Sequence, residues 1–232
     1  MAYAMPGSSS TTPDLFDGDP AGAPAITLGP GAALLRGFAL PVAPVLREGV
    51  LALARIAPWR HMETPGGRAM SVATTSCGRL GWVSDRRGYR YAPLDPESGT
   101  AWPAMPDAFR RLAREAAAHA GFPDFEPDSC LVNRYAPGAR LSLHQDRDEQ
   151  DLQAPIVSVS LGLPAVFLWG GFARTGPVER VPLQHGDVVV WGGPDRLRFH
   201  GVQPVKDDLH PEWGAERVNL TFRKAGWAPG PS

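Results

Sequence analysis

Two residues in the segment Leu131–Glu149 have the types and the spacing of metal ligands. His144 and Asp146 are two positions apart, and in an extended chain such side chains leave the same face. The pair needs a third ligand, for which His185 and His200 are candidates. His185 precedes a Gly-Asp turn, whereas His200 lies in a run with strand character that would hold its side chain rigidly. We therefore expect His200 to complete the site.

Two histidines and one carboxylate would form the facial triad of non-haem Fe(II) oxygenases, which keeps coordination positions open for a cosubstrate and oxygen. The ligand types therefore predict iron-dependent oxygen chemistry. The pair alone is weak evidence, because a histidine and an aspartate fall two positions apart by chance in many chains. A second motif has to support it.

The segment Arg217–Arg223, RVNLTFR, alternates strictly between polar and apolar residues. This period of two predicts a half-buried strand. Arg217 and Arg223 share the polar face, and a planar guanidinium binds a carboxylate through two parallel hydrogen bonds. We expect the two arginines to address the two ends of a short diacid. The alternative is a strand whose polar face meets water.

Several segments, in this order and spacing, resemble the AlkB family of alkylated-nucleic-acid repair dioxygenases: NRYAPGARLSLHQDRDE, PIVSVSLGLPAVF, HGDVVVWGGPDRLRFHGV and RVNLTFR. Upstream, MSVATTSCGRLGWVSDRRGYRYAPLDP and WPAMPDAF resemble the family's substrate-binding region. The resemblance runs from about Gly31 to Gly226. It implies a dioxygenase that uses Fe(II), 2-oxoglutarate and O2 to demethylate 1-methyladenine and 3-methylcytosine in single-stranded DNA, with RNA as a further substrate class. The products would be formaldehyde, succinate and carbon dioxide.

The resemblance also implies roles for individual residues. The metal ligands fall on His144, Asp146 and His200. The residues implied for 2-oxoglutarate are Asn133, Tyr135, Arg217, Asn219 and Arg223. The residues implied for the substrate are Trp82, Tyr89, Tyr91, Asp148, Glu149 and Arg174. Asp148 would accept a hydrogen bond from the exocyclic amino group of a flipped base, with Glu149 as a second candidate. For the last three residues the alternative is a solvated loop charge.

The stretch Trp59–Pro96 has few long apolar runs and many glycines, arginines and aromatic residues. Aromatic rings stack on bases and guanidinium groups pair with phosphates, so this mixture suits single-stranded nucleic acid. A floppy surface insertion would have a similar composition. The resemblance favours a nucleotide-recognition lid, in which Trp82 stacks on the damaged base and Tyr89, with Tyr91 nearby, holds backbone phosphate.

The periodicity predicts an α+β protein with helices before a strand-rich half. Helices are expected at Pro44–Ala57 and Pro106–Ala120, each with an apolar stripe. After Ser129, short strands separated by Gly and Pro turns indicate a double-sheet jelly roll, in agreement with the double-stranded β-helix that the resemblance implies. The strands are expected at Cys130–Tyr135, Ile156–Leu161, Ala165–Trp169, Asp187–Trp191, Leu197–Val202 and Glu216–Arg223.

The 232 residues fit one integrated domain. Residues 1–24, rich in Ser, Thr, Pro and Gly, are expected to form a disordered tail, and residues 227–232 a loose C-terminus. Between them, residues 25–128 would carry the N-terminal helices and the lid, and residues 129–226 the double-stranded β-helix core.

Composition limits the partners and the compartment. The net charge of -1 excludes a protein coated in positive charge, so a nucleic acid would be met by a local patch. Cys77 and Cys130 form no CxxC motif and are expected to be buried free thiols. No apolar run is long enough to cross a membrane and no secretion signal is visible. These features predict a monomer in the cytoplasm with no membrane partner.

Three other functions compete with DNA demethylation. The same chemistry could act on RNA alone, on a protein side chain or on a small metabolite, although the aromatic and arginine content of the lid argues against the last two. A catalytically silent nucleic-acid-binding module would not need three metal ligands. A cupin-like binder of small molecules would share the jelly roll but would not need the RVNLTFR strand.

Overall fold

The structure, a computed structural model, describes residues 25–226. The tail predicted for residues 1–24 and the loose end predicted for residues 227–232 lie outside the described residues. Within them, two α-helices form close to the predicted bounds, α1 at Ala43–Ile56 and α2 at Asp107–His119. Each buries one apolar stripe, which includes Leu46 and Val50 in α1 and Phe109 and Leu112 in α2. Neither helix is long and apolar enough to cross a membrane.

Two antiparallel sheets stack to form the jelly-roll core. In the described region the larger sheet has eight strands in the order β1-β2-β12-β9-β14-β7-β4-β3 and the smaller has four in the order β11-β10-β13-β8. The larger sheet comprises β1 (Ala25–Gly29), β2 (Ala32–Leu35), β12 (Val188–Trp191), β9 (Ile156–Gly162), β14 (Arg217–Arg223), β7 (Ser129–Tyr135), β4 (Ala69–Gly78) and β3 (Arg60–Glu63). The smaller comprises β11 (Glu179–Leu183), β10 (Ala165–Trp169), β13 (His200–Val202) and β8 (Leu141–His144). A separate hairpin pairs β5 (Gly81–Asp85) with β6 (Gly88–Ala92).

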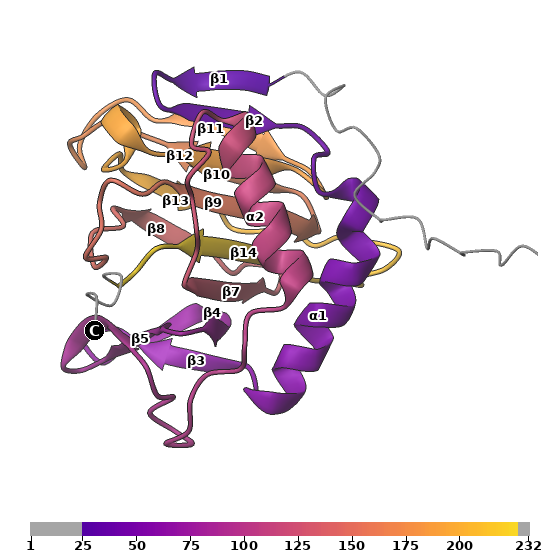
Figure 1. The fold of residues 1–232 in the computed structure, drawn as a ribbon, viewed down its shortest axis with the longest axis vertical. Helices are drawn as coiled ribbons and strands as arrows, with labels where there is room; N and C mark the ends of the chain where they lie inside the picture. The colour runs from indigo at the N-terminus through magenta and orange to yellow at the C-terminus, as the bar shows by residue number, and fades with distance from the viewer. Residues whose placement is uncertain (1–24, 227–232) are drawn as a thin grey trace, which may run out of the picture.

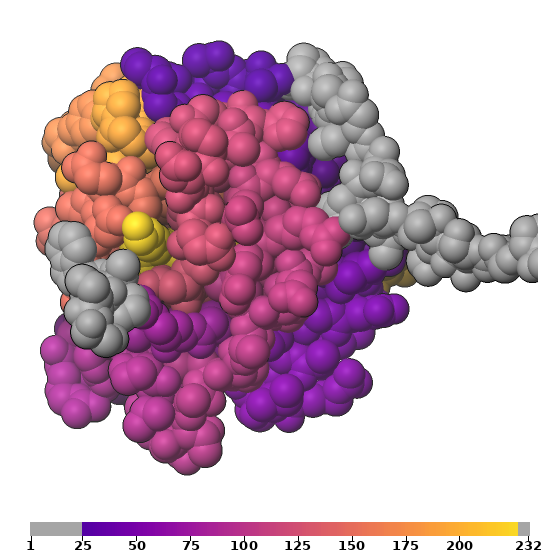
Figure 2. Space-filling view, viewed as in Figure 1, coloured from indigo at the N-terminus to yellow at the C-terminus, as the bar shows by residue number. Residues whose placement is uncertain are grey.

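The helices cover the outer face of the larger sheet, and the smaller sheet lies behind it (Figure 1). Figure 2 shows the α2 segment as a continuous surface over that face. The helix-covered core contains the apolar residues of the central strands, among them Val132, Val159 and Leu220. Cys77 and Cys130 face each other across β4 and β7 as buried free thiols, as expected.

Strand β14 shows the predicted alternation but not the predicted exposure. Val218, Leu220 and Phe222 belong to the helix-covered core. The polar face is not half-exposed, because all seven residues of the strand are buried. The smaller sheet covers the side on which Arg217 and Arg223 lie, so their guanidinium groups point into the protein interior and not into water.

The predicted lid is shorter than the stretch Trp59–Pro96. Its first half forms β3 and β4, and β4 pairs with β7 from Ala73 to Gly78 as part of the larger sheet. Only the β5–β6 hairpin stands as a separate element. Strand β4 escaped prediction because its buried side chains, such as Thr74 and Ser76, are small and polar, so hydrophobic alternation is absent.

The last predicted strand before β14 is also shorter than expected. Residues Leu197–Phe199 are not in a strand, and β13 begins only at His200. A 3-10 turn at Gly193–Asp195 precedes it. The structure still holds His200 rigidly, because β13 pairs with β10 on one side and with β8 on the other.

Candidate active site

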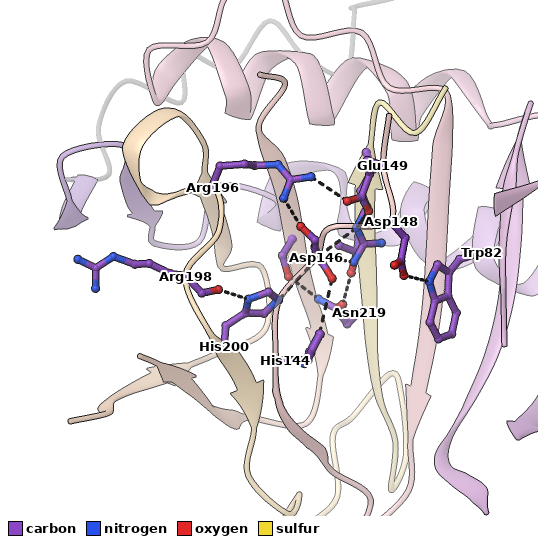
Figure 3. Close-up of polar contacts among 12 residues, drawn as sticks. Trp82, His144, Asp146, Asp148, Glu149, Arg196, Arg198, His200 and Asn219 are labelled. Atoms are coloured by element: carbon purple, nitrogen blue, oxygen red, sulfur yellow. Dashed lines mark hydrogen bonds and ion pairs between the residues drawn. The ribbon is translucent and has the colours of Figure 1, made fainter. Parts of the chain in front are cut away.

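Three predicted metal ligands meet between the two sheets. His144 ends β8, His200 begins β13, and the two are paired across these neighbouring strands. Asp146 follows β8 by two residues, and its two carboxylate oxygens each lie 3.7 Å from one histidine, Oδ1 from His144 Nε2 and Oδ2 from His200 Nε2. One ligand atom from each residue lies within 4.8 Å of the others. The close-up shows the three side chains converging (Figure 3).

Backbone carbonyls orient both imidazole rings. His144 Nδ1 lies 2.9 Å from the carbonyl oxygen of Ser142, and His200 Nδ1 lies 3.1 Å from that of Arg198. A carbonyl only accepts, so each Nδ1 carries a proton, and the atom of each ring that lies toward Asp146 and can bind a metal is Nε2. Burial, with His144 beside it, lowers the pKa of His200 to about 3, which keeps that ring neutral and ready to bind a metal.

Arg223 keeps the third ligand ionised. Burial alone would raise the pKa of Asp146, but Arg223 and the two histidines lower it well below its usual range. The Arg223 guanidinium donates to Asp146 Oδ2 from Nη2 at 2.7 Å and from Nε at 3.1 Å. One nitrogen, Nη1, is buried without a hydrogen-bond partner in the described part of the chain. Arg223 therefore retains one donor for a further anion.

Arg217, at the other end of β14, is a buried cation without a carboxylate partner among the described residues. It donates from Nη2 to Ser160 Oγ at 3.0 Å and packs over the ring of Tyr135 at 4.8 Å. Its Nε and Nη1 atoms are buried without a partner, and burial lowers its pKa. Buried donors of this kind are costly unless they are paired. A ligand carboxylate would accept hydrogen bonds from these two nitrogens of Arg217.

The other residues predicted for 2-oxoglutarate lie on the same face of β7 and β14 as the two arginines. Asn133 and Asn219 are directly opposite each other in β7 and β14, and Tyr135 is buried beside Arg217. The side chain of Asn219 is largely used within the protein. Its Nδ2 donates to Ser158 Oγ at 2.8 Å and to the carbonyl of Val159 at 2.9 Å. The side-chain amide of Asn219 therefore has no N–H left for a ligand.

Near the metal ligands, the β5–β6 hairpin presents aromatic rings (Figure 3). Trp82 stacks on Tyr89 with 5.5 Å between ring centroids and 14° between planes. The indole Nε1 of Trp82 donates to Asp148 Oδ2 at 3.3 Å, which joins the hairpin to the loop that follows the metal motif (Figure 3). Tyr89 and Asp148 also line a depression of about 730 Å³ beside the hairpin. Rings and an acceptor therefore stand together next to the metal ligands.

Three predicted substrate residues lie differently from one another. The hydroxyl of Tyr91 turns inward and donates to Glu149 Oε1 at 2.7 Å, so it does not face a phosphate. Glu149 is buried and also pairs with Arg223 and, through Oε2 at 3.0 Å, with Arg196. Both carboxylate oxygens are bound by protein side chains, so the geometry indicates a structural role for Glu149 and no contact with a base. Arg174 is exposed in the β10–β11 loop.

Arg196 is a site residue that the sequence did not reveal. It is 3% exposed and donates to the carbonyl of Asp146 at 2.6 Å, to that of Ala154 at 3.0 Å and to Glu149. These contacts fasten the loop after β8, which carries Asp146, to the turn that leads into His200. Its partners are 42 to 50 residues away in the chain, so no local pattern marks it.

Replacing Arg196 with methionine is expected to lower the free energy of unfolding of the apoprotein by about 3–5 kcal/mol, because Glu149 would lose a partner of a buried ion pair. Urea titration measures this value. The matched control is Arg114→Met, which removes an exposed pair with Glu126 at 3.3 Å and should cost at most about 1 kcal/mol. Similar losses in the two variants would contradict the structural weight given to Arg196.

The comparisons with known proteins agree with this geometry. The sequence model of the 2OG-Fe(II) oxygenase superfamily matches residues 31–223, which include all the residues of the candidate site. The class is thus an Fe(II) and 2-oxoglutarate-dependent dioxygenase. The chain is 56% identical to the alpha-ketoglutarate-dependent dioxygenase AlkB of Escherichia coli (strain K12), over 92% of this chain and 98% of that protein. This chain therefore belongs to the AlkB family.

More distant relatives extend the same picture. The chain is 32% identical to the DNA N(6)-methyladenine demethylase ALKBH1C of Arabidopsis thaliana, over 62% of this chain and 38% of that protein. The solved structure of OsALKBH1 matches with a TM-score of 0.76 and 29% identity, over 87% of this chain and all 100% of that one. The jelly roll described above is therefore shared with the family.

The family uses Fe(II), 2-oxoglutarate and O2, and the residues present fit these groups. Two imidazole nitrogens and one carboxylate oxygen are the donor set of a non-haem Fe(II) site with open positions. The unpartnered nitrogens of Arg217 and Arg223 fit the carboxylates of a short diacid. When bound, iron and 2-oxoglutarate supply the activation of oxygen; the protein supplies orientation and the exclusion of water.

Proposed function

We propose that this enzyme oxidatively demethylates 1-methyladenine and 3-methylcytosine in single-stranded DNA, with RNA as a further substrate class, and releases formaldehyde, succinate and carbon dioxide. The observation that carries the proposal is the hydrogen bond between Trp82 and Asp148 beside the metal ligands. An aromatic face and a carboxylate acceptor are what a flipped base with an exocyclic amino group requires. The similarity to the Arabidopsis relative, a DNA N(6)-methyladenine demethylase, supports nucleic acid as the substrate class.

In this proposal the residues divide by face. His144, Asp146 and His200 hold the iron. Arg217 clamps one carboxylate of 2-oxoglutarate through its unpartnered nitrogens, and Arg223 reaches the other end while it keeps Asp146 ionised. Tyr135 and Asn133 shape the pocket between them. The cosubstrate would thus bind to the arginines of β14, and the methylated base would bind beside the β5–β6 hairpin.

The substrate side has to accept a base that has left its stack. Extrusion costs a few kcal/mol and costs least for a damaged or single-stranded base. Trp82 and Tyr89 offer ring faces on which such a base can stack, and Asp148 offers an exposed carboxylate. Methyl groups at N1 of adenine and N3 of cytosine block pairing, so these two lesions are the expected substrates.

Replacing Trp82 with alanine is expected to raise the apparent KM for a methylated oligonucleotide about 10-fold, because one stacked base is worth roughly 1–3 kcal/mol. Decarboxylation of 2-oxoglutarate without substrate should stay close to that of the unchanged enzyme, since Arg217 and Arg223, and not Trp82, are proposed to hold the cosubstrate. Steady-state kinetics with and without oligonucleotide measure both. Parallel loss of the two activities would show that Trp82 supports the fold and not the substrate.

The nucleic acid itself is tested with four matched oligonucleotides of one sequence, each carrying one 1-methyladenine: single-stranded DNA, double-stranded DNA, single-stranded RNA and double-stranded RNA. The proposal expects the highest kcat/KM for single-stranded DNA. A clear preference for RNA would favour the RNA-specific alternative. Turnover of none of them, with succinate still formed, would point to another substrate for the same iron chemistry.

We also infer that residues 25–226 act as one integrated domain of a cytoplasmic monomer. The buried free thiols of Cys77 and Cys130 support a reducing compartment. Trp82 and Tyr91 of the hairpin donate hydrogen bonds to Asp148 and Glu149 in the loop that follows β8, and these contacts between the hairpin and the core support a single unit. Light scattering after gel filtration should give the mass of one chain, and a dimer mass would contradict the inference.

A further inference from the structure

An exposed aromatic ring packs on Arg198, two residues before the metal ligand His200. Phe172, in the loop between β10 and β11, is 59% exposed. Beneath it, the guanidinium of Arg198 lies 5.3 Å from the Phe172 ring and 5.4 Å from the ring of the buried Trp169. The three side chains form a stack, Trp169–Arg198–Phe172, whose outer ring is open to solvent. We call this stack the Phe172 platform.

The Phe172 platform is held rigidly. Arg198 donates from Nε to Asp195 Oδ1 at 2.6 Å and from Nη1 to the carbonyl of Gly170 at 2.9 Å. The loop backbone is fixed as well, because Gly170 N donates to the carbonyl of Phe199 at 2.8 Å and Phe199 N donates to the carbonyl of Gly171 at 2.9 Å. A ring that packs on a guanidinium fixed in this way loses less conformational freedom when a ligand stacks on it than a ring without support.

The position of the Phe172 platform relates it to the site. Arg198, its central member, accepts the hydrogen bond of His200 Nδ1 through its own carbonyl. In Figure 3 the side chain of Arg198 extends to one side of His144, Asp146 and His200, and Trp82 lies on the opposite side. A chain molecule that crosses the metal ligands from Trp82 can therefore continue toward Phe172.

Unpaired positive charge accompanies the exposed ring. Arg174 and Arg180, in the same loop and the following strand β11, are exposed and have no carboxylate partner among residues 25–226. An aromatic face beside unpaired guanidinium groups fits a base together with its backbone phosphate.

We propose that Phe172 is a second stacking platform, on which the base next to the methylated base rests while its phosphate meets Arg174. This inference rests on the proposed function and deepens it, because it extends the contact from one nucleotide to a strand. It predicts that the enzyme prefers an oligonucleotide over a methylated mononucleotide, and that part of this preference comes from the π face of residue 172.

The test compares Phe172→Ala, Phe172→Leu and Phe172→Trp with the unchanged enzyme. The control is Leu209→Ala, which trims another exposed apolar side chain, 78% exposed. The substrates are a single-stranded DNA pentamer with a central 1-methyladenine and the mononucleotide 1-methyl-dAMP. The ratio of kcat/KM for pentamer over mononucleotide should fall about 10-fold in Phe172→Ala, the scale of one lost stacked base. Phe172→Leu should fall nearly as far, whereas Phe172→Trp and Leu209→Ala should keep the ratio.

A direct readout uses pentamers with 2-aminopurine on either side of the methylated base, bound anaerobically to the enzyme with Fe(II) and 2-oxoglutarate. Quenching at one flanking position that disappears in Phe172→Ala would support the stacking platform. An unchanged ratio and unchanged quenching in Phe172→Ala would overturn it and assign the ring to another partner. Retention of the ratio in Phe172→Leu would also overturn it. Failure of the unchanged enzyme to demethylate either substrate would instead overturn the proposed function.

Discussion

Replacement of His200 by alanine is expected to lower iron-dependent turnover by at least about 100-fold, more than the loss caused by changing a residue that only supports a ligand. His200 contributes one of three ligand atoms within 4.8 Å of each other, together with His144 and Asp146, and no further histidine in the described chain belongs to this cluster. Formation of succinate from 2-oxoglutarate measures turnover. Anaerobic Fe(II) titration of the same variant should show a matching loss of metal affinity.

His185 is the matched control, since the sequence alone left it as the other candidate for third ligand. In the structure its Nδ1 accepts from the backbone N–H of Gly162 at 3.0 Å, and its ring faces His210 with 4.6 Å between centroids. It belongs to a separate pair of histidines. His185→Ala should therefore keep iron-dependent turnover. Loss of turnover in His185→Ala, with His200→Ala active, would mean that the wrong third ligand had been chosen.

Replacement of Arg217 by methionine is expected to raise the Kd for 2-oxoglutarate about 30-fold or more, since losing one partner of a buried charge pair costs about 2–5 kcal/mol. The unpartnered Nε and Nη1 of Arg217 are the donors that the cosubstrate would fill. Isothermal titration in the presence of Mn(II), which replaces iron without supporting turnover, measures the affinity. An unchanged Kd would show that Arg217 does not bind 2-oxoglutarate and that β14 has only a structural role.

The same variant weakens ligand binding but should not lower the stability of the apoprotein. Without a ligand, Arg217 is a buried charge that lacks a carboxylate among the described residues, so Arg217→Met should leave the apoprotein at least as resistant to urea. Arg134→Met is the control. Arg134 lies in the neighbouring strand β7, opposite Val218, and is partly exposed on the helix-covered face. It should leave the Kd for 2-oxoglutarate unchanged.

The sequence predicted the site through parity and motif spacing. The i and i+2 spacing of His144 and Asp146 and the strand character around His200 suggested these three residues, and the family resemblance implied the same set, which the structure brings together. The alternation of RVNLTFR predicted that Arg217 and Arg223 share a face. The predicted half-exposure of this strand was wrong, because the second sheet that covers the face of Arg217 and Arg223 comes from residues far away in the chain.

The parts that the sequence could not predict depend on long-range partners. Glu149 and Tyr91 looked like substrate residues, yet their side chains meet each other across 58 positions. Strand β4 was taken for lid because its small polar residues, such as Thr74, give no hydrophobic pattern, and its burial follows from pairing with β7. In each case the local sequence is compatible with two environments, and the sheet topology selects one.

The central claim is that this site removes a methyl group from a base in a reaction that depends on both iron and 2-oxoglutarate. The most direct measurement reconstitutes the protein anaerobically with Fe(II), then adds air, 2-oxoglutarate and a single-stranded oligonucleotide with one 1-methyladenine, and follows the oligonucleotide by mass spectrometry. We predict the loss of one methylene's mass, which requires both iron and 2-oxoglutarate. An unchanged oligonucleotide, with succinate accumulating, would leave the iron centre intact and contradict the substrate.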